Sequence, residues 1–276
     1  TLTFGVSPSF LKKMNLENKS LEEFKDLPPF AREQLKEKYT GGDICIQPCA
    51  DDEQVAFHAV RNLIRKARST VTMKWSQSGF AAIGNRKETP RNLFGFKDGT
   101  ANATKEDQFN NIVWCDKDNW MKGGSYMAVR RIQMHLETWD RTNLNEQEHT
   151  FGRYKDSGAP LGEKDEFATV DLEKKGPDGK LYIPEDSHVH LAHKTGVELL
   201  RRSYSYADGI NDTTGQFESG LLFISFQKNP QQFITVQNSL GNEDKMNEYI
   251  THIGSGLFAC FGGVKEGEYI GQKLFE

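Results

Sequence analysis

The sequence has few cysteines and no long apolar run, and these two absences exclude several kinds of protein. Only four of the 276 residues are Cys: Cys45, Cys49, Cys115 and Cys260. They are too few and too scattered for a disulfide framework. Because none forms a Cys-x-x-Cys pair, the sequence argues against a zinc or iron–sulfur site built from Cys. No apolar run approaches the roughly 18 residues that a membrane-spanning helix requires, so no membrane span is expected.

An excess of positive charge is missing as well. The chain has 35 Lys plus Arg against 39 Asp plus Glu, a formal net charge of -4, whereas nucleic-acid-binding proteins normally carry a basic surplus. We therefore expect no nucleic-acid partner. A composition of 36% hydrophobic and 27% charged residues is typical of a globular protein rather than a disordered one. The length allows one large or two small domains with a substantial core.

The first residues lack both the basic and the apolar region of a secretory signal peptide. Instead, Leu2, Phe4 and Val6 alternate with Thr3 and Gly5, which predicts a strand that is already under way. We therefore expect the chain to begin inside a fold, with the first part of its first domain missing at the N-terminus.

Periodicity predicts two strand–helix–strand units. In the first unit, a strand over 43–47 precedes a helix that Asp51 would cap, with Gln54 three residues on. An apolar stripe carries this helix to Ala67, and a strand over 71–75 follows. The second unit is predicted to contain strands over 126–136, 221–226 and 256–261, and helices near 138–149, 230–240 and 243–252.

The shared pattern of the two halves indicates two domains. We predict α+β domains over residues 1–118 and 119–276, each an antiparallel sheet with helices on one face. The stretches 85–125 and 152–187 contain many Gly and charged residues and are predicted to be largely loop. Loops of this length are unusual inside compact domains, and those that occur are often functional.

The first segment that could take part in a reaction has an acid between two glycines. Residues 92–100 read Asn-Leu-Phe-Gly-Phe-Lys-Asp-Gly-Thr, with Asp98 between Gly95 and Gly99. One interpretation is a turn in which Asp98 bonds to its own backbone. The other is a carboxylate held beside two Phe rings, where loss of solvent tunes it for proton transfer. The pattern alone leaves both open.

The second segment is rich in histidine. His188, His190 and His193 fall within six residues and are three of the seven His in the chain. They could form a solvated polar turn. Alternatively, His188 and His190 would share one face of a strand and bind a metal together. A single His acting as an axial ligand to haem iron is a third interpretation.

The third segment places Arg201 and Arg202 directly after Leu199 and Leu200. Two Arg beside an apolar pair usually lie in solvent at the end of a helix or strand. An Arg that faces inward would instead clamp an anion or stabilise negative charge that develops during a reaction.

Taken together, these segments resemble the dye-decolourising (DyP-type) haem peroxidases, in particular their exported, iron-uptake-associated deferrochelatase/peroxidase branch. The resemblance runs from Leu2 to Leu274. The motifs that carry it are Gly-x-x-Asp-Gly at 95–99, Phe-Gly-Arg at 151–153, Gly-Ala-Pro-Leu-Gly at 158–162, Ser-His-Val-x-Leu-Ala at 187–192, Leu-Arg-Arg-x-Tyr-Ser-Tyr at 200–206 and Gly-Leu-Leu-Phe at 220–223. All of them occur in the family's order.

The resemblance implies a role for each site residue. His188 would be the proximal axial ligand of the iron of haem b, Asp98 the distal acid/base and Arg201 the distal arginine. Relatives often carry Arg two places after the proximal His, where this chain has His190, so His190 stays open as an alternative ligand. Glu218 is a candidate acceptor for the N–H of His188. Further haem contacts are implied for Gly99, Thr100, Ala101, Arg153, Lys194 and Arg201.

The resemblance also implies a fold and a function. The fold would be two ferredoxin-like domains, and the function a peroxidase that reduces hydrogen peroxide while oxidising a one-electron donor such as a dye or a porphyrinogen. Alternatives are a deferrochelatase that releases iron from haem with the porphyrin intact, and a non-enzymatic haem carrier or sensor. Because an unperturbed Asp titrates near pH ~3.9 and His near ~6.5, an Asp base predicts turnover that peaks on the acid side.

The branch carries implications for location and partners too. It implies export by a twin-arginine signal upstream of Thr1, an extracytoplasmic location, an iron-uptake permease system as a partner and a homo-oligomer. A bulky dye does not easily reach a buried haem, so surface aromatic residues would pass the electrons. The candidates are Trp114, Trp120, Trp139, Tyr204 and Tyr206.

Overall fold

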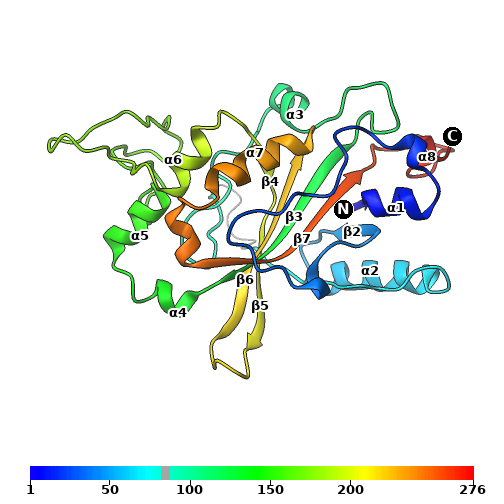
Figure 1. Ribbon diagram of the computed structural model, residues 1–276, viewed down its shortest axis with the longest axis horizontal. Coiled ribbons are helices and arrows are strands. Elements are labelled where there is room, and N and C mark those ends of the chain that lie inside the picture. Colours follow the sequence, from blue (N-terminus) through cyan, green and yellow to red (C-terminus); the bar gives the residue numbers. More distant parts are fainter. Residues whose placement is uncertain (82–87) are drawn as a thin grey trace.

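In the computed structural model, which describes residues 1–81 and 88–276, the chain folds around one curled sheet (Figure 1). The described strands run in the order β2-β1-β7-β3-β6-β4, and β5 also pairs with β6. Every pairing between them is antiparallel, so the predicted α+β class with antiparallel strands is confirmed. The strands are β1 (Leu2–Val6), β2 (Ile44–Pro48), β3 (Ser125–Met134), β4 (Leu200–Arg201), β5 (Tyr204–Ile210), β6 (Phe217–Gln227) and β7 (Ile250–Cys260).

The strands of the two predicted halves are hydrogen-bonded to one another. Gly5 and Val6 of β1 pair with Cys260 and Ala259 of β7, and β2 pairs along β1 on its other side. In the part of the chain that the structure describes, both halves therefore contribute to one continuous seven-stranded sheet.

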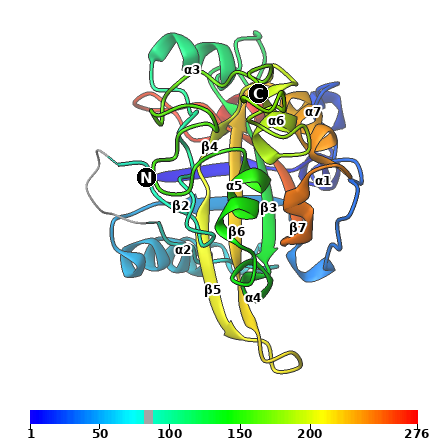
Figure 2. The same cartoon turned by 90° about the vertical axis from the view of Figure 1, so that its left-hand side faces the viewer.

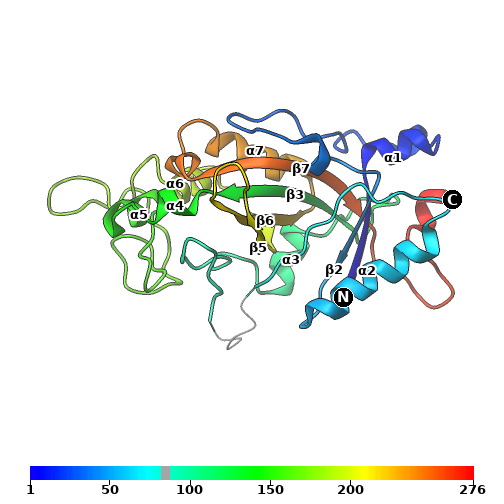
Figure 3. The same cartoon turned by 90° about the horizontal axis from the view of Figure 1, so that it is seen from below.

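The central strand β3 explains where the core lies. It pairs with β6 on one side and β7 on the other, and nine of its ten residues are buried. Side chains alternate between the two faces of a strand. Tyr126 and Ala128 accordingly join one apolar cluster with Phe233 of α7 (Pro230–Leu240), whereas Met127 and Val129 join another. Figure 3 shows α7 beside the sheet, where it contacts β3 and β6.

The remaining helices are short, apart from α2 (Glu53–Ala67), which Asp52 rather than Asp51 caps. Within the described residues, no helix is both long and apolar enough to cross a membrane. The others are α1 (Pro8–Lys13), α3 (Glu106–Ile112), α4 (Leu136–Trp139), α5 (Leu144–Phe151), α6 (His188–His193) and α8 (Gln272–Phe275), with 3₁₀ turns η1 (Glu17–Lys19), η2 (Glu37–Tyr39) and η3 (Lys245–Glu248).

Three local predictions were wrong. The segment 71–75 is not a strand; Trp75 instead donates its indole N–H to the carbonyl of Gly41 at 2.9 Å and packs on the sheet. The helix near 138–149 is two helices, α4 and α5, because Asn143 caps a new start. The helix over 243–252 is only the turn η3, since Ile250 already pairs with Met134 of β3.

The β5–β6 hairpin extends beyond the rest of the molecule (Figure 2). Most of the residues between α5 and α6 form the predicted long loop. This loop and α6 lie at the end of the molecule away from β1 and β2 (Figure 1). The candidate site residues come from this loop, from α6, from β4 and from the segment after residue 88.

Candidate active site

His188 is the first residue of α6 and its ring is held by a buried carboxylate. Ser187 caps the helix, its hydroxyl oxygen accepting from the N–H of His190 at 3.3 Å. Nδ1 of His188 lies 2.7 Å from Oδ2 of Asp244, a residue that is only 4% exposed. Because a carboxylate accepts, this partner assigns the proton to Nδ1 and leaves the Nε2 lone pair available to a metal.

Asp98 and Arg201 come from distant segments and meet. Oδ1 of Asp98 lies 3.4 Å from Nη1 of Arg201, and both side chains are half-buried. Arg201 belongs to β4, where it pairs with Ser225 of β6. Asn102 holds the two segments in register, since its amide donates to the carbonyl of Arg201 at 2.7 Å and its Oδ1 accepts from the Arg201 N–H at 2.9 Å.

Gly99 makes this turn possible. Its φ of +107° lies in the region that favours glycine, and its carbonyl accepts from the N–H of Asn102 at 3.0 Å. The N–H of Asp98 donates to the carbonyl of Pro90 at 2.8 Å. The Asp98 backbone is therefore held from both sides of the loop.

Arg153 brings a second cation to the same region. Its Nη1 donates to the carbonyls of Gly158, at 2.7 Å, and Glu166, at 3.0 Å. Burial and the nearby charge of Arg201 lower the pKa of Arg153. Burial, followed by the charges of Arg153 and Arg201, also lowers the pKa of His193. Two guanidinium groups thus lie near His193 at the end of α6.

Comparison with known proteins decides the family. The family model described as Dyp-type peroxidase, N-terminal, matches residues 1–81, and the one described as Dyp-type peroxidase, C-terminal, matches residues 89–265. The chain belongs to the Dyp-type peroxidase family. The resemblance that the sequence motifs indicated is therefore confirmed.

Individual relatives of this family member agree. It is 39% identical over 290 residues to the dye-decolorizing peroxidase of Thermobifida fusca, covering 100% of the chain and 67% of the relative. It is 38% identical to the deferrochelatase of Escherichia coli K12, covering 98% and 65%. The chain thus spans about two thirds of the length of these curated relatives.

Solved structures share the fold. The oxyferrous complex of DtpA from Streptomyces lividans matches with a TM-score of 0.95 at 37% identity, covering 100% of this chain and 78% of that one. The DyP-type peroxidase from Cellulomonas bogoriensis matches with a TM-score of 0.95 at 35% identity and the same coverage.

The structure brings together most, though not all, of the residues that the sequence predicted for the site. Asp98 pairs with Arg201, and the charges of Arg153, Arg201 and His188 all act on His193. Thr100 points into a neighbouring carboxylate network, and its Oγ1 donates to Glu166 at 2.9 Å. Ala101 and Lys194 are exposed. The haem contacts predicted for them stay predictions.

Two interpretations of the histidine segment were wrong. His188 and His190 lie on a helix rather than a strand, so residues two apart point in different directions. Glu218 is not the partner of His188; its Oε1 accepts from Asn211 at 2.9 Å in the β5–β6 hairpin. In residues 1–81 and 88–276, no three His, Cys, Asp or Glu cluster as a metal site.

The sequence did not indicate three residues that hold the candidate site together. Asp244 follows α7, and in the sequence it resembles an ordinary helix cap. It does cap η3. Asn102 lies in a polar loop with no distinguishing pattern. Glu166 lies in the middle of the long loop, where its neighbours in the sequence carry no motif. Each acts on a segment far away in the chain, and no spacing rule predicts such a contact.

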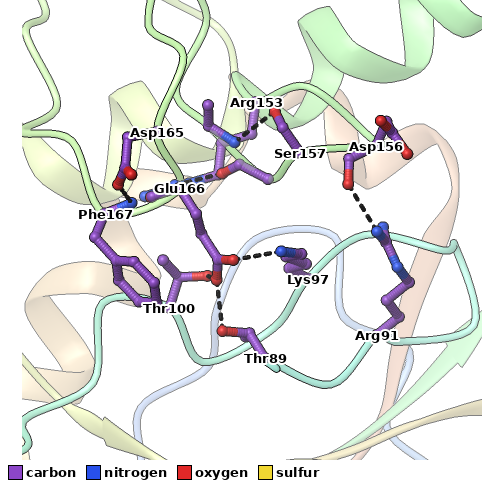
Figure 4. A network of polar contacts seen from close by, with 12 residues as sticks. Thr89, Arg91, Lys97, Thr100, Arg153, Asp156, Ser157, Asp165, Glu166 and Phe167 are labelled. Atoms are coloured by element: carbon purple, nitrogen blue, oxygen red, sulfur yellow. Dashed lines mark hydrogen bonds and ion pairs between the residues drawn. The ribbon is translucent and has the colours of Figure 1, made fainter. Parts of the chain in front are cut away.

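Glu166 is the centre of the network in Figure 4. Its carboxylate accepts from Thr89 at 2.5 Å and from Thr100 at 2.9 Å, and it also pairs with Lys97. Burial alone would raise the pKa of Glu166, but the hydrogen bonds from Lys97, Thr89 and Thr100 outweigh burial and leave the pKa lowered. Glu166 is thus an ionised acceptor that joins the long loop to the Asp98 loop.

Proposed function

We propose that this protein is a haem b-dependent peroxidase that reduces hydrogen peroxide and oxidises a one-electron donor. The observation that carries the proposal is the pairing of Asp98 with Arg201 in the region where Asp244 orients His188. A carboxylate beside a guanidinium supplies a proton acceptor and a charge stabiliser together. Solved structures of DtpA from Streptomyces lividans, at 37% identity, are of its ferric form and its oxyferrous complex, which supports an iron cofactor.

The residues present fit haem. His188 offers Nε2 to the iron, and Asp244, by accepting from Nδ1, raises the basicity of the ring. Arg153 and Arg201 supply positive charge suited to the carboxylates of a haem. When bound, the haem supplies the redox chemistry, while the protein provides ligation, proton transfer and access.

Asp98 is the group that moves the proton. Its carboxylate accepts a proton from one oxygen of hydrogen peroxide and returns it to the other, which leaves as water. The two electrons that this cleavage requires would come from a haem held by His188, which would also retain the remaining oxygen. Arg201, whose Nη1 lies 3.4 Å from the Asp98 carboxylate, stabilises negative charge as the O–O bond breaks. Because Asn102 bonds to the backbone of Arg201 and its N–H bonds to Gly99, the two groups keep their separation.

The test is Asp98→Asn in the haem-loaded protein. The substitution keeps shape but removes the base, so we expect the rate of reaction with peroxide to fall by about 10²–10⁴-fold. The Soret band should stay the same and remain dependent on His188. Asp156→Asn, an exposed acid in the neighbouring loop, is the control. An Asp98→Asn variant as fast as the parent would refute the proposal and favour a haem carrier.

Deferrochelatase activity is a second candidate, because relatives with that name are 38% identical over nearly the whole chain. It predicts that free protoporphyrin, measured by its fluorescence, accumulates from haem. Absence of protoporphyrin with a donor present would exclude it. An extracytoplasmic location, an iron permease partner and a homo-oligomer stay predictions from the branch resemblance.

Among the predicted electron-transfer residues, Trp114 is the most accessible. Trp139 and Tyr206 are each 1% exposed and Trp120 is 8% exposed, whereas Trp114 is 44% exposed. The three buried rings serve packing, and we propose Trp114 as the entry point for electrons from bulky dyes. Trp114→Phe should slow oxidation of a bulky dye and spare a small donor. Equal rates for both donors would contradict this role.

A further inference from the structure

We propose that Glu166 is a positioning residue: it holds Lys97 away from Asp98, so that Asp98 pairs with Arg201 alone. This inference rests on the proposed function, because it assigns the proton transfer to Asp98. It concerns a residue that does not itself touch the reacting atoms.

Glu166 bonds to the Asp98 loop on both sides of Asp98. Lys97 is the residue before Asp98, and Thr100 follows it by two positions; both donate to the Glu166 carboxylate. The side chain of Glu166 is only 10% exposed and that of Lys97 is 18% exposed. A buried ion pair of this kind is costly to break on one side only, since the other charge is left without compensation.

The two loops also fit closely. A Cβ on Gly158 would lie 2.6 Å from Cδ of Lys97, so the lysine stem needs a glycine beside it. Arg91 adds a second tie, since its guanidinium donates to the carbonyls of Gly95 at 2.8 Å, Lys155 at 2.5 Å and Asp156 at 2.7 Å. Figure 4 shows the contact of Arg91 with Asp156 and that of Lys97 with Glu166. The direction of the Lys97 side chain is therefore set by contacts with the long loop.

The consequence concerns charge near Asp98. Lys carries a compact cation on a flexible four-carbon stem, and Lys97 is adjacent in sequence to Asp98. With Glu166 ionised, the cation is neutralised within the loop interface. Without that carboxylate, Lys97 becomes free to pair with Asp98, to compete with Arg201 and to hold the acid in its charged form.

The experiment compares Glu166→Gln with the double variant Lys97→Met/Glu166→Gln in the haem-loaded protein. Gln keeps the acceptor for the Thr hydroxyls but loses the charge, so we expect the peroxide reaction to slow by about tenfold, less than full loss of the acid/base costs. Met removes the competing cation and keeps the stem, so the double variant should return to within about threefold of the parent. Haem affinity and KM for the donor should not change.

Glu163→Gln is a matched control. Glu163 pairs with Lys174 at 2.5 Å in the same long loop, and neither side chain has a described hydrogen bond to the Asp98 loop. Its loss should leave the peroxide reaction unchanged. A readout independent of activity is acylation of lysines measured by peptide mass spectrometry: Lys97 should react faster in Glu166→Gln, and not in Glu163→Gln.

Two results would overturn the inference. One is a Glu166→Gln rate equal to the parent's; the other is a double variant as slow as Glu166→Gln, which would indicate a purely structural role. If Glu166→Gln does not fold, the single variant Lys97→Met tests the proposal instead. It has no cation to release near Asp98, so a decrease in the peroxide rate as large as that of Asp98→Asn would refute the proposal. If Asp98→Asn is slow while Glu166→Gln is fast, only this inference fails; an Asp98→Asn as fast as the parent overturns both.

Discussion

At the scale of single residues, burial distinguishes the carboxylate that bonds to His188 from one that does not. Asp244 is 4% exposed and bonds to His188, whereas Glu218 bonds to Asn211 in a protruding hairpin. Both are carboxylates that the sequence alone treats alike. The difference arises because only one of them is enclosed with the imidazole, where a charge is not screened by water.

Asp244→Asn should therefore weaken haem binding. The amide keeps the shape but is a poorer acceptor for the N–H of His188, and loss of such a partner typically lowers metal affinity or activity by about 10–100-fold. Haemin titration followed at the Soret band measures the effect. Glu218→Gln should bind haemin like the parent, and a reversed order of the two variants would return Glu218 to the site.

His252 should make stability depend on pH. It is 8% exposed, and burial, followed by the charges of Arg130 and His188, lowers its pKa from 6.5 to about 3. Below pH 6.5 His252 binds a proton in the unfolded chain but not in the folded protein. The free energy of unfolding is therefore unaffected by His252 above that pH, and it decreases as the pH falls below it, by up to roughly 1.4 kcal/mol per pH unit.

Urea unfolding at pH 7, 6 and 5 measures this slope. His252→Gln removes the titrating group, so its free energy of unfolding should change less over this range than the parent's. Other groups contribute equally to both proteins, and the difference between them isolates His252. Identical slopes would show that folding does not lower the pKa of His252.

At the scale of elements, the sheet requires small residues where strands cross closely. Gly220 of β6 lies opposite Gln133 of β3, and a Cβ there would lie 1.9 Å from the carbonyl oxygen of Ile132 and 2.7 Å from the hydroxyl of Tyr206. The hydroxyl of Tyr206 already donates to that carbonyl at 3.1 Å. No rotamer change relieves a contact with backbone.

Gly220→Ala should destabilise the protein by about 3 kcal/mol or more, at the upper end of overpacking effects. Gly263→Ala is the control, because a Cβ there meets nothing within 4 Å. Chemical unfolding of both variants gives the comparison. Equal stability of the two would mean that β5 or β3 shifts at little cost.

At the scale of the whole molecule, one sheet spans both predicted halves, and the candidate site lies at one end of it (Figure 1). His188, Asp98 and Arg201 come from a helix, a loop and a strand, and the last two pair directly. A ligand that bridges these elements stabilises the entire fold, because it binds the folded chain and not the unfolded one.

Haem loading should therefore raise the melting temperature. At free haemin of about 100 times Kd, the gain is about 2.7 kcal/mol, which corresponds to roughly 5 °C or more for a chain of this size. His188→Ala should lose most of the increase. Calorimetry with and without haemin tests this, and an equal rise in His188→Ala would indicate binding elsewhere.

The sequence was informative where one segment carries its own signal. The alternation over 126–136 and the apolar run over 221–226 are local signals, and they predicted β3 and the second half of β6. The motifs that carry the family resemblance are local too, and they implied roles for Asp98, His188 and Arg201. Local patterns also misled: the alternation over 71–75 has no partner strand there, and Trp75 bonds to Gly41 instead.

What only the tertiary structure decided are contacts between segments far apart in the chain. Three such contacts join residues from different elements: Asp244 bonds to His188, Asn102 to Arg201, and Glu166 to the Asp98 loop. Hydrogen bonds and ion pairs act over a few ångströms of space, and sequence spacing reports such distances only within a helix or a strand. Side-chain types predicted the chemistry; the way the chain packs determined which carboxylate meets which cation.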